Sequence, residues 1–534
     1  MRCLCVKKDR GGQDARPTRA GYREKTENVF KKLLIANRGE IALRIMRTCR
    51  ELGIATVAVY SEADRTSLHV RYADEAHLLG PGTPGESYLN IQRVMDAAQR
   101  SGAEAIHPGY GFLAENPAFV DACEAAGVIF VGPSSRTMRL LGDKIAARKL
   151  AADAGVPVVP GEENVASADE ALTAADRLGY PVLVKAVSGG GGKGIRLVGS
   201  RDEMEAALRV AGTEAASAFG DHNLYIEKFL ERVRHVEVQF LADSHGGIVA
   251  LGERECSIQR RHQKLIEESP SSAVDAALRE KLCAASVEVA RAAGYSNAGT
   301  AEFLVDDAGR FYFLEINARL QVEHPVTELV SGIDLVAEQL RIAAGERLSF
   351  TQDVESRGWA IECRIAAEGP DFLPSLGRVD YVSEPAGPGI RVDSALFAGA
   401  DIPYYYDPMI AKVIVWGHDR EEAIRRMQRA LAEFVVVGVD TNVPLHLRIL
   451  RDPRFLAGDI HTTFLEREFE ATPGSDDEEK RVALLAAALL AHRRDKRVRA
   501  SISARDGSGW KTYRRQAAMR GEQTRNATWR RSID

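Results

Sequence analysis

The sequence of 534 residues is 45% hydrophobic and 28% charged, which is ordinary for a globular protein of two to four domains. Its net charge of −5 combines +4 in residues 1–29, −20 in residues 30–479 and +11 in residues 480–534, and the acidic body argues against a nucleic-acid-binding core. No stretch approaches the roughly 18 consecutive apolar residues of a membrane helix, which argues against a membrane protein.

The ends of the chain and its cysteines favour a cytoplasmic location. Residues 1–29 lack the apolar segment of a signal peptide and are interpreted as a disordered extension, or as the product of a start codon assigned too early. The seven cysteines are scattered and include no C-x-x-C pair, so they predict neither a disulfide framework nor a zinc site. The basic segment 480–534 is interpreted as a solvated extension, with contact to an acidic partner or RNA as the alternative.

Apolar strand patterns alternate with helix patterns in the first part of the chain. The helix pattern EIALRIMRTCRELG lies between the strand patterns KKLLIA (31–36) and TVAVY (56–60), and the segments IHPGYGFLAEN (106–116) and GVIFVG (127–132) continue the alternation. Strands and helices at this spacing predict βαβ units around a parallel sheet. We expect this first domain at residues 30–142.

A glycine-rich segment, SGGGGKG (188–194), lies between two apolar strand patterns, PVLVKAV and IRLVGS. Glycines allow backbone N–H groups to close over an anion, and Lys193 adds positive charge, so the segment predicts a mobile hairpin lid over phosphates. It does not fit the Walker A pattern, because Gly194 follows Lys193, and a flexible linker is the alternative. Lys185 on the preceding strand is expected to contact an anion, with a structural salt bridge as the alternative.

Two further strand patterns, TAEFLVD and FYFLEIN, flank the turn DAGR and predict a β-hairpin. If Asp306 pairs with Phe311, Glu302 lies directly opposite Glu315, and two facing carboxylates destabilise a strand pair. A divalent cation would remove the repulsion, and Asn317 offers a third oxygen, which predicts a Mg²⁺ or Mn²⁺ site. The alternative is a pair of solvated glutamates at a sheet edge.

The alternation continues after this hairpin, with Arg319, Gln321 and Glu323 spaced two residues apart before Pro325 is expected to end strand pairing. Arginine presents a planar fork to a carboxylate or to bicarbonate, and a glutamate beside that fork is a candidate general base. A half-solvated strand would explain the same spacing. Continuity with the predicted metal ligands favours a catalytic site.

The remaining segments are less specific on their own. Antiparallel strand patterns occupy residues 224–256, and a third block at residues 358–470 mixes strands with a helix. The basic cluster RRHQK, His235, His262 and Arg364 are each also explained by ordinary core or solvated positions. The segment ATPGSDDEE is interpreted as an acidic linker that precedes a helix pattern and the basic tail.

Nine motifs taken together resemble those of the biotin carboxylases, members of the ATP-grasp superfamily, over residues 31–470. They are IANRGEIALRI, IHPGYGFLAEN, MRLLGDK, SGGGGKG, RHVEVQF, SIQRRHQKLIEE, EINARLQVEHPVTE, GWAIECRIAAE and YYYDPMIAK. The resemblance implies an α/β fold with a Rossmann-like N-terminal domain at 30–142. It implies next an ATP-grasp domain at 143–350, whose glycine-rich lid spans about 157–229, and a mixed α+β C-terminal domain at 358–470.

By position, the resemblance also implies roles for residues of each domain. The nucleotide-binding positions are Lys144, Lys185, Gly190, Gly191, Gly192, Lys193, Gly194, Glu227, Lys228, Phe229, Leu230, His235, Gln259, His262, Glu302 and Glu315. The metal-binding positions are Glu302, Glu315 and Asn317. The bicarbonate and biotin positions are Lys264, Arg319, Gln321, Val322, Glu323 and Arg364, with Glu323 as the base and Arg364 stabilising the biotin enolate. Arg44 and Arg47 match positions of a homodimer contact.

The resemblance further implies an ATP-dependent ligase that performs the first half-reaction of an acyl-CoA carboxylase. Glu323 would deprotonate bicarbonate, which attacks the γ-phosphate of magnesium-bound ATP to give carboxyphosphate, the source of CO₂ for biotin. The chain has no Ala-Met-Lys-Met motif, so biotin is expected on a separate carrier protein, with a separate carboxyltransferase completing the reaction. The alternatives are another ATP-grasp ligase, such as a carbamoyl-phosphate synthetase half, and a non-catalytic subunit that docks a biotin carrier.

Overall fold

A computed structural model of the chain describes residues 30–162, 168–186, 195–219, 224–261, 263–350, 354–467 and 469. Up to Phe469 these residues form one compact unit. The predicted N-terminal extension, the glycine-rich segment, His262, and the linker and tail from residue 471 onward lie outside the described residues. Within the described ranges, no helix is both long and apolar enough to cross a membrane.

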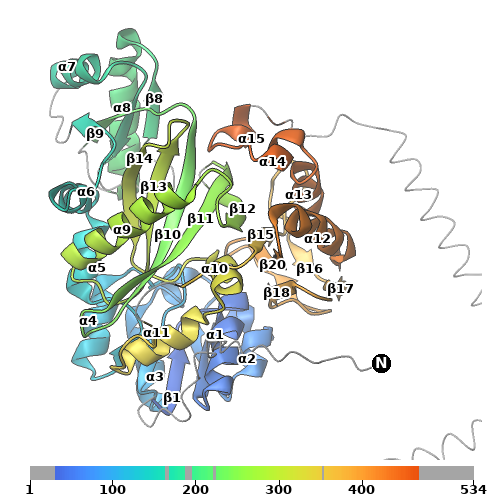
Figure 1. Cartoon of the computed structure of the whole chain (residues 1–534). Helices are drawn as coiled ribbons and strands as arrows, with labels where there is room; N and C mark the ends of the chain where they lie inside the picture. Colours follow the sequence, from blue (N-terminus) through green and yellow to red (C-terminus); the bar gives the residue numbers. More distant parts are fainter. Residues whose placement is uncertain are drawn as a thin grey trace, which may run out of the picture. The chain divides into compact units, whose positions relative to one another are not determined.

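Five strands near the start of the chain form a parallel sheet, coloured blue to cyan in Figure 1. They are β1 (Lys32–Ile35), β2 (Ala55–Ser61), β3 (Glu75–Gly80), β4 (Ala105–His107) and β5 (Ile129–Phe130), in the order β3-β2-β1-β4-β5. The helices of this region are α1 (Gly39–Glu51), α2 (Leu68–Tyr72), α3 (Ile91–Ser101), α4 (Pro117–Ala125) and α5 (Ser135–Gly142). Alternate residues of β1 belong to different cores, because Leu33 packs with α1 and Leu34 packs with α3 and α4. The predicted parallel sheet of βαβ units is confirmed.

A four-stranded antiparallel sheet contains the strands on either side of the glycine-rich segment. Its strands are β6 (Gly161–Glu162), β7 (Val182–Ala186), β8 (Ile195–Val198) and β9 (Leu224–Lys228), in the order β6-β9-β7-β8. Helices α7 (Ala168–Leu178) and α8 (Met204–Phe219) share an apolar core with Val182, Val184 and Ile226. The predicted pair of strands is confirmed, and Lys185 lies opposite Ile195 in it.

Eight antiparallel strands form the central sheet, which runs across the middle of Figure 1. They are β10 (Val233–Ala242), β11 (Ile248–Arg260), β12 (Gln263–Ser269), β13 (Asn297–Asp306), β14 (Phe311–Asn317), β15 (Trp359–Ala366), β18 (Ile390–Ser394) and β20 (Met409–Gly417). The order is β14-β13-β10-β11-β12-β15-β20-β18. Strands from the third block of the sequence therefore extend the same sheet that carries the predicted metal hairpin, through the pairing of β12 with β15.

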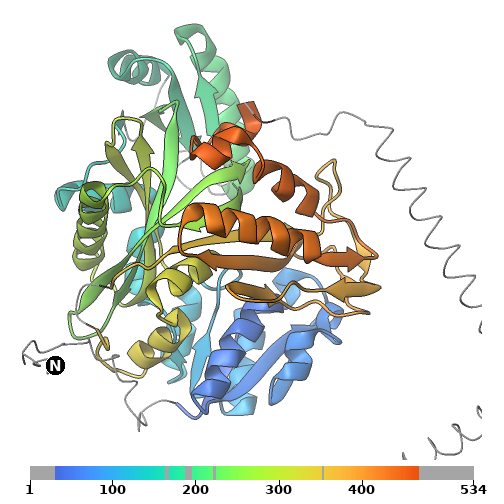
Figure 2. The same cartoon turned by 45° about the vertical axis from the view of Figure 1, so that its right-hand side comes forward.

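Helices cover parts of this sheet. Helix α9 (Ala276–Ala292) packs with Phe303 and Phe313 in one apolar core, and α12 (Arg420–Glu433) lies over β15 and β20 (Figure 2). Helices α6 (Lys144–Asp153), α10 (His324–Ser331) and α11 (Leu335–Ala343) flank the sheet. The shorter elements are β16 (Gly377–Arg378), β17 (Tyr381–Ser383), β19 (Asp401–Ile402), β21 (Val435–Val437), α13 (Val443–Ile449), α14 (Pro453–Ala457) and α15 (Phe464–Arg467).

Candidate active site

A cavity of about 1230 Å³ opens against the central sheet. It is lined by residues of that sheet, of the four-stranded sheet and of the segments that follow β1, β3 and β4. The sequence-predicted residues on its wall are Lys144, Lys185, Glu227, Lys228, Phe229, Leu230, His235, Gln259, Lys264, Glu302, Glu315, Asn317, Arg319, Gln321, Val322 and Arg364. Glu323 is not part of the wall, but its carboxylate contacts Lys264 and Arg364 directly behind it. The sequence-predicted residues on the wall are up to 220 positions apart in the sequence, as the separation of Lys144 from Arg364 illustrates.

Charged residues lie in a row across four neighbouring strands of the central sheet. Glu315 on β14 is opposite Glu302 on β13, Glu302 is opposite Glu237 on β10, and Glu237 is opposite Arg254 on β11. Three adjacent carboxylates in one row repel each other unless cations lie between them. The row therefore requires cations at this point of the sheet.

The hairpin register differs from the prediction, although Glu302 and Glu315 do lie opposite each other. Phe311 pairs with Val305 and not with Asp306, and a bulge between Glu302 and Phe303 shifts the register by one residue. The predicted facing of the two glutamates is right because the bulge compensates for the wrong register at the turn.

The residues after Asn317 do not continue the strand, which corrects the prediction of one unbroken strand. Strand β14 ends at Asn317, and α10 begins at His324, directly after Glu323. Pro325 lies in the first turn of α10, where a missing N–H costs no helical hydrogen bond. Glu323 is therefore positioned by a helix start and not by strand alternation.

The segment between β14 and α10 nevertheless returns its polar side chains to the hairpin. Arg319 donates from Nη2 to Asn317 Oδ1 at 3.2 Å, and Gln321 donates from Nε2 to Glu302 Oε1 at 3.3 Å. Arg319 also pairs with Glu115 at 3.0 Å, which sequence reasoning did not find. An arginine fork thus lies beside the two facing glutamates.

Lys264 is the cation at the centre of the site. Its Nζ lies 2.6 Å from Glu237, 2.9 Å from Glu302 and 2.7 Å from Glu323. Burial lowers the pKa of Lys264, but the three carboxylates outweigh this effect and hold the pKa well above its usual value. The side chain is therefore charged, and it joins the facing glutamates to Glu323.

Glu323 is fully buried and shared between two cations. Its Oε1 lies 2.7 Å from Lys264 Nζ, and its Oε2 accepts from Arg364 Nη2 at 2.8 Å. Burial raises the pKa of Glu323, but Lys264, Arg364 and Arg254 outweigh it and hold the pKa well below its usual value. The carboxylate is ionised and can accept a proton.

The facing glutamates have different electrostatic surroundings. Burial raises the pKa of Glu302, but Lys264 and His235 outweigh burial and lower it, and His235 Nε2 lies 3.1 Å from Glu302. Burial and the charge of Glu302 together raise the pKa of Glu315, for which the described residues offer no ion-pair partner. A half-buried carboxylate without an ion-pair partner among the described residues, opposite a second carboxylate and with Asn317 beside it, fits a hard divalent cation.

The other end of the cavity carries lysines and a buried arginine. Lys185 Nζ lies 2.6 Å from Glu227 Oε1, and Arg148, which the sequence reasoning missed, donates to Glu227 Oε2 at 3.0 Å. Burial lowers the pKa of Lys185, but Glu227 outweighs it and raises the pKa. Lys144 begins α6 and lines the same cavity. Two or three positive charges at one end of a cavity suit a polyphosphate.

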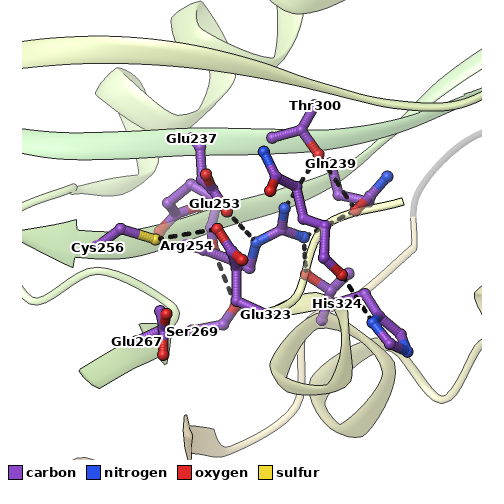
Figure 3. Close-up of polar contacts among 12 residues, drawn as sticks. Glu237, Gln239, Glu253, Arg254, Cys256, Glu267, Ser269, Thr300, Glu323 and His324 are labelled. Carbon is purple, nitrogen blue, oxygen red and sulfur yellow. Dashed lines mark hydrogen bonds and ion pairs between the residues drawn. The ribbon is translucent and has the colours of Figure 1, made fainter. Parts of the chain in front are cut away.

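Arg254 is a second residue that the sequence reasoning missed, and its side chain is completely buried. Figure 3 shows it among its polar neighbours. It donates to Glu237, to Gln239 Oε1 at 2.8 Å, to Thr327 Oγ1 at 2.9 Å and to Thr300 Oγ1 at 3.1 Å. It thereby connects β10, β11, β13 and α10 behind Lys264. A charged residue inside the strand pattern GEREC was the one sequence signal that could have found it.

Replacing Arg254 with methionine should lower the free energy of unfolding by about 3–5 kcal/mol, because Glu237 would remain buried without its arginine. Urea unfolding of the full chain measures this change. The control is Arg357→Met, whose ion pair with Glu355 is exposed and should cost less than about 1 kcal/mol. Equal stability of the two variants would contradict the structural role given to Arg254.

The two arginines of the predicted dimer contact differ in their exposure. Arg44 is buried and pairs within the chain with Glu328 at 2.7 Å and with Asp334 at 2.8 Å. Arg47, one turn further along α1, is exposed. A dimer contact through these positions stays a prediction, with Arg47 as the accessible member.

Comparison with known proteins identifies the family. Three protein-family models match the chain in order: the biotin carboxylase N-terminal domain at residues 29–138, the carbamoyl-phosphate synthase L chain ATP-binding domain at 143–351, and the biotin carboxylase C-terminal domain at 362–467. Biotin carboxylase 1 of Bacillus subtilis is 54% identical over 443 residues, which are 82% of this chain and 98% of that protein. The chain belongs to the biotin carboxylase family.

Solved biotin carboxylases share the fold of this one. The Campylobacter jejuni enzyme, solved as a beta-gamma-ATP complex, has a TM-score of 0.81 at 45% identity and covers 82% of this chain and 99% of its own. The biotin carboxylase domain dimer of Hydrogenobacter thermophilus 2-oxoglutarate carboxylase, solved with MgADP, ADP and bicarbonate, has a TM-score of 0.81 at 46% identity, over 84% of this chain and 100% of its own. The predicted α/β fold with an ATP-grasp centre is confirmed.

The predicted enzyme class is also confirmed, since this biotin carboxylase is an ATP-dependent ligase. The match to a carbamoyl-phosphate synthase domain is confined to the middle of the chain, and the two flanking matches decide against that alternative. Relatives include components of larger carboxylases. One of them, a pyruvate carboxylase component of Methanothermobacter thermautotrophicus, is 53% identical over 458 residues, or 85% of this chain and 92% of that protein.

Proposed function

We propose that this biotin carboxylase carboxylates biotin held on a carrier protein, with ATP and bicarbonate as co-substrates. The observation that carries the proposal is the position of Lys264, which contacts Glu302 on one side and Glu323 on the other. One ammonium thus links the facing glutamates, where a nucleotide-bound metal would lie, to the candidate base. We further propose that the enzyme acts in the cytoplasm together with carrier and carboxyltransferase subunits.

The nucleotide and its metal would occupy the part of the cavity between α6 and the central sheet. Glu302, Glu315 and Asn317 would hold Mg²⁺ or Mn²⁺, which neutralises charge on the phosphates when bound. Lys144 and Lys185 would bind phosphate oxygens, and the segment 190–194 would close over them. The base and ribose would be lined by Lys228 at the end of β9, by Phe229 and Leu230 directly after it, and by Glu227, His235, Gln259 and His262.

Bicarbonate would bind between Arg319 and Lys264. Glu323 would take its proton, and a bicarbonate oxygen would attack the γ-phosphorus of ATP. The bond between the γ-phosphorus and the bridging oxygen breaks, ADP leaves, and carboxyphosphate forms. Arg319, Gln321 and the backbone at Val322 would hold the anion in line for attack, so that positioning supplies most of the rate enhancement.

Biotin would react in the same cavity after this step. Carboxyphosphate releases CO₂ and phosphate, and the phosphate removes the N1′ proton of biotin. The resulting enolate, which Arg364 would stabilise, forms its N–C bond to CO₂ and yields carboxybiotin. Exclusion of water would protect the unstable intermediate from hydrolysis.

The metal assignment predicts opposite effects of one substitution on stability and on metal dependence. Glu315→Gln should raise the Mg²⁺ concentration for half-maximal ATP cleavage by about 10- to 100-fold, because one oxygen ligand loses its charge. It should also stabilise the metal-free protein, because the repulsion with Glu302 disappears. Magnesium titrations of activity, and urea unfolding in a chelator, measure the two effects.

The matched control for this experiment is Glu466→Gln, which removes a carboxylate from an exposed position on the same cavity wall. The magnesium dependence of that variant should equal that of the parent chain. A Glu315→Gln variant with unchanged magnesium dependence would contradict the assignment.

The proposed activity is tested by ATP cleavage with purified full chain, MgATP and free biotin. Cleavage should require bicarbonate and should be stimulated by biotin. Cleavage that requires ammonia and ignores biotin would support the carbamoyl-phosphate alternative, and the absence of cleavage would support a non-catalytic docking role.

We also propose that the chain forms a homodimer with α1 in the contact. The dimer structure of the Hydrogenobacter thermophilus domain supports a homodimer of this chain. Arg47→Glu should shift the chain toward monomers in sedimentation velocity, because an exposed cation in the contact is reversed. A parent chain that is monomeric at high concentration would contradict the proposal.

A further inference from the structure

A second pair of facing carboxylates lies in the central sheet, away from the proposed metal site. Glu267 on β12 is directly opposite Glu362 on β15, and both side chains are completely buried. Two charged carboxylates at directly opposed positions destabilise a strand pair, and no divalent-cation ligand set surrounds these two among the described residues. The arrangement therefore needs another explanation.

The two glutamates differ in what holds them. Glu267 Oε1 accepts from Arg364 Nε at 2.5 Å. Neither oxygen of Glu362 has a hydrogen-bond partner in the described structure. A buried carboxylate without a partner is costly, whereas a neutral carboxylic acid at the same position is far less so. The geometry thus favours one proton on the pair, held by Glu362.

Electrostatics agree with this division of roles. Burial raises the pKa of Glu362 well above its usual value, and Glu267 raises it further against the opposing charge of Lys412. Burial, opposed by the charge of Arg364, raises the pKa of Glu267 to about 7, which is a smaller rise than that of Glu362 because only Glu267 has an arginine hydrogen bond that favours its ionised form. Glu267 is therefore the member of the pair whose negative charge has a hydrogen-bonding partner.

The negative charge of Glu267 orients the side chain of Arg364. Its Nε is held by Glu267 and its Nη2 by Glu323 at 2.8 Å, while the described residues offer no acceptor for Nη1. Its backbone is fixed independently, because the Arg364 carbonyl accepts from Asn442 Nδ2 at 3.0 Å and from His446 Nε2 at 2.8 Å. Glu267 thus determines the rotation of the guanidinium and leaves one N–H edge for a ligand in the cavity.

We propose that Glu267 is a positioning residue, ionised while Glu362 opposite it is protonated, and that it holds Arg364 in the orientation needed for carboxyl transfer to biotin. The proposal rests on the proposed function, in which Arg364 acts on biotin. Glu323 retains Lys264 as a partner whatever happens to Arg364. The biotin step should therefore depend on Glu267 more strongly than the bicarbonate step.

Two matched substitutions test the proposal, because each removes one carboxylate from the same strand pair. Glu267→Gln should lower the biotin-stimulated rate of ATP cleavage by about 10- to 100-fold, the worth of a charged hydrogen bond, and should lower it more than the biotin-independent rate. Glu362→Gln resembles the neutral acid that it replaces and should stay within about twofold of the parent in both rates. Equal losses in the two variants, or a Glu267→Gln loss that is the same with and without biotin, would overturn the proposal.

A spectroscopic measurement keeps the proposal testable if a variant folds poorly or if the proposed function is wrong. At a pH well above the ordinary carboxyl pKa, the parent chain should show the infrared carbonyl band of a neutral carboxylic acid, and Glu362→Gln should lack it. A parent chain without this band would overturn the protonated pair. A parent chain with the band but without biotin-stimulated cleavage would overturn the proposed function, and with it the role of Arg364 in the biotin step.

Discussion

Glu323→Gln is expected to lower the rate of bicarbonate-dependent ATP cleavage by about 10²- to 10⁴-fold, the usual worth of a general base. Glutamine keeps the size of the side chain and its acceptor oxygen, but it cannot take the proton of bicarbonate. The low pKa that Lys264 and Arg364 impose on Glu323 does not argue against this role, because a bound bicarbonate anion offsets their charge and raises that pKa. ADP release at saturating bicarbonate measures the loss.

The control for this variant is Glu368→Gln, which neutralises another buried carboxylate on the cavity wall. Glu368 pairs with Arg260 at 3.1 Å and does not contact Lys264 in the described structure. Its substitution should change the rate of ATP cleavage far less. If Glu323→Gln cleaves ATP as fast as the parent, Glu323 is not the base.

Lys264→Met is expected to damage both stability and activity. Without the ammonium, the negative charges of Glu237, Glu302 and Glu323 lie close together and lose the cation that all three contact. We therefore expect the free energy of unfolding to fall by about 3–5 kcal/mol. We also expect bicarbonate-dependent ATP cleavage to fall by at least about 10²-fold, because the anion site loses its central cation. Urea unfolding and initial rates of ADP release measure the two losses.

Lys264→Arg separates these two effects. Arginine retains the positive charge, so this variant should recover much of the stability that Lys264→Met loses. Its planar guanidinium cannot contact three carboxylates at once as the compact ammonium does, so the activity of the variant should stay low. A methionine variant as stable as the parent would show that the three carboxylates do not depend on Lys264.

Local patterns in the sequence predicted the parts of the site that depend on neighbouring strands. The pairing of Glu302 with Glu315 follows from one short hairpin, where register is set over a few residues. The bulge after Glu302 left no trace in the sequence pattern, because the residues that follow it are apolar like those of an unbroken strand. The parallel sheet and the strands β7 and β8 were likewise visible as short apolar runs.

Contacts between distant segments could not be predicted in the same way. The pairing of β12 with β15, which brings Arg364 to Glu267, joins residues 97 positions apart, and no periodicity encodes that register. The turn after Asn317 was mistaken for a strand because a turn and a helix start can place polar residues two apart as readily as a strand does. The resemblance to a family supplied Arg364, but not Arg254 or Glu267.

The most direct measurement follows labelled carbon from bicarbonate to biotin. Purified full chain is incubated with MgATP, free biotin and ¹⁴C-bicarbonate, and acid-labile label on biotin is compared with the ADP formed. We expect label on biotin that requires ATP and is lost in Glu323→Gln. ATP cleavage without any label on biotin would contradict the central claim that one cavity activates bicarbonate and delivers its carbon to biotin.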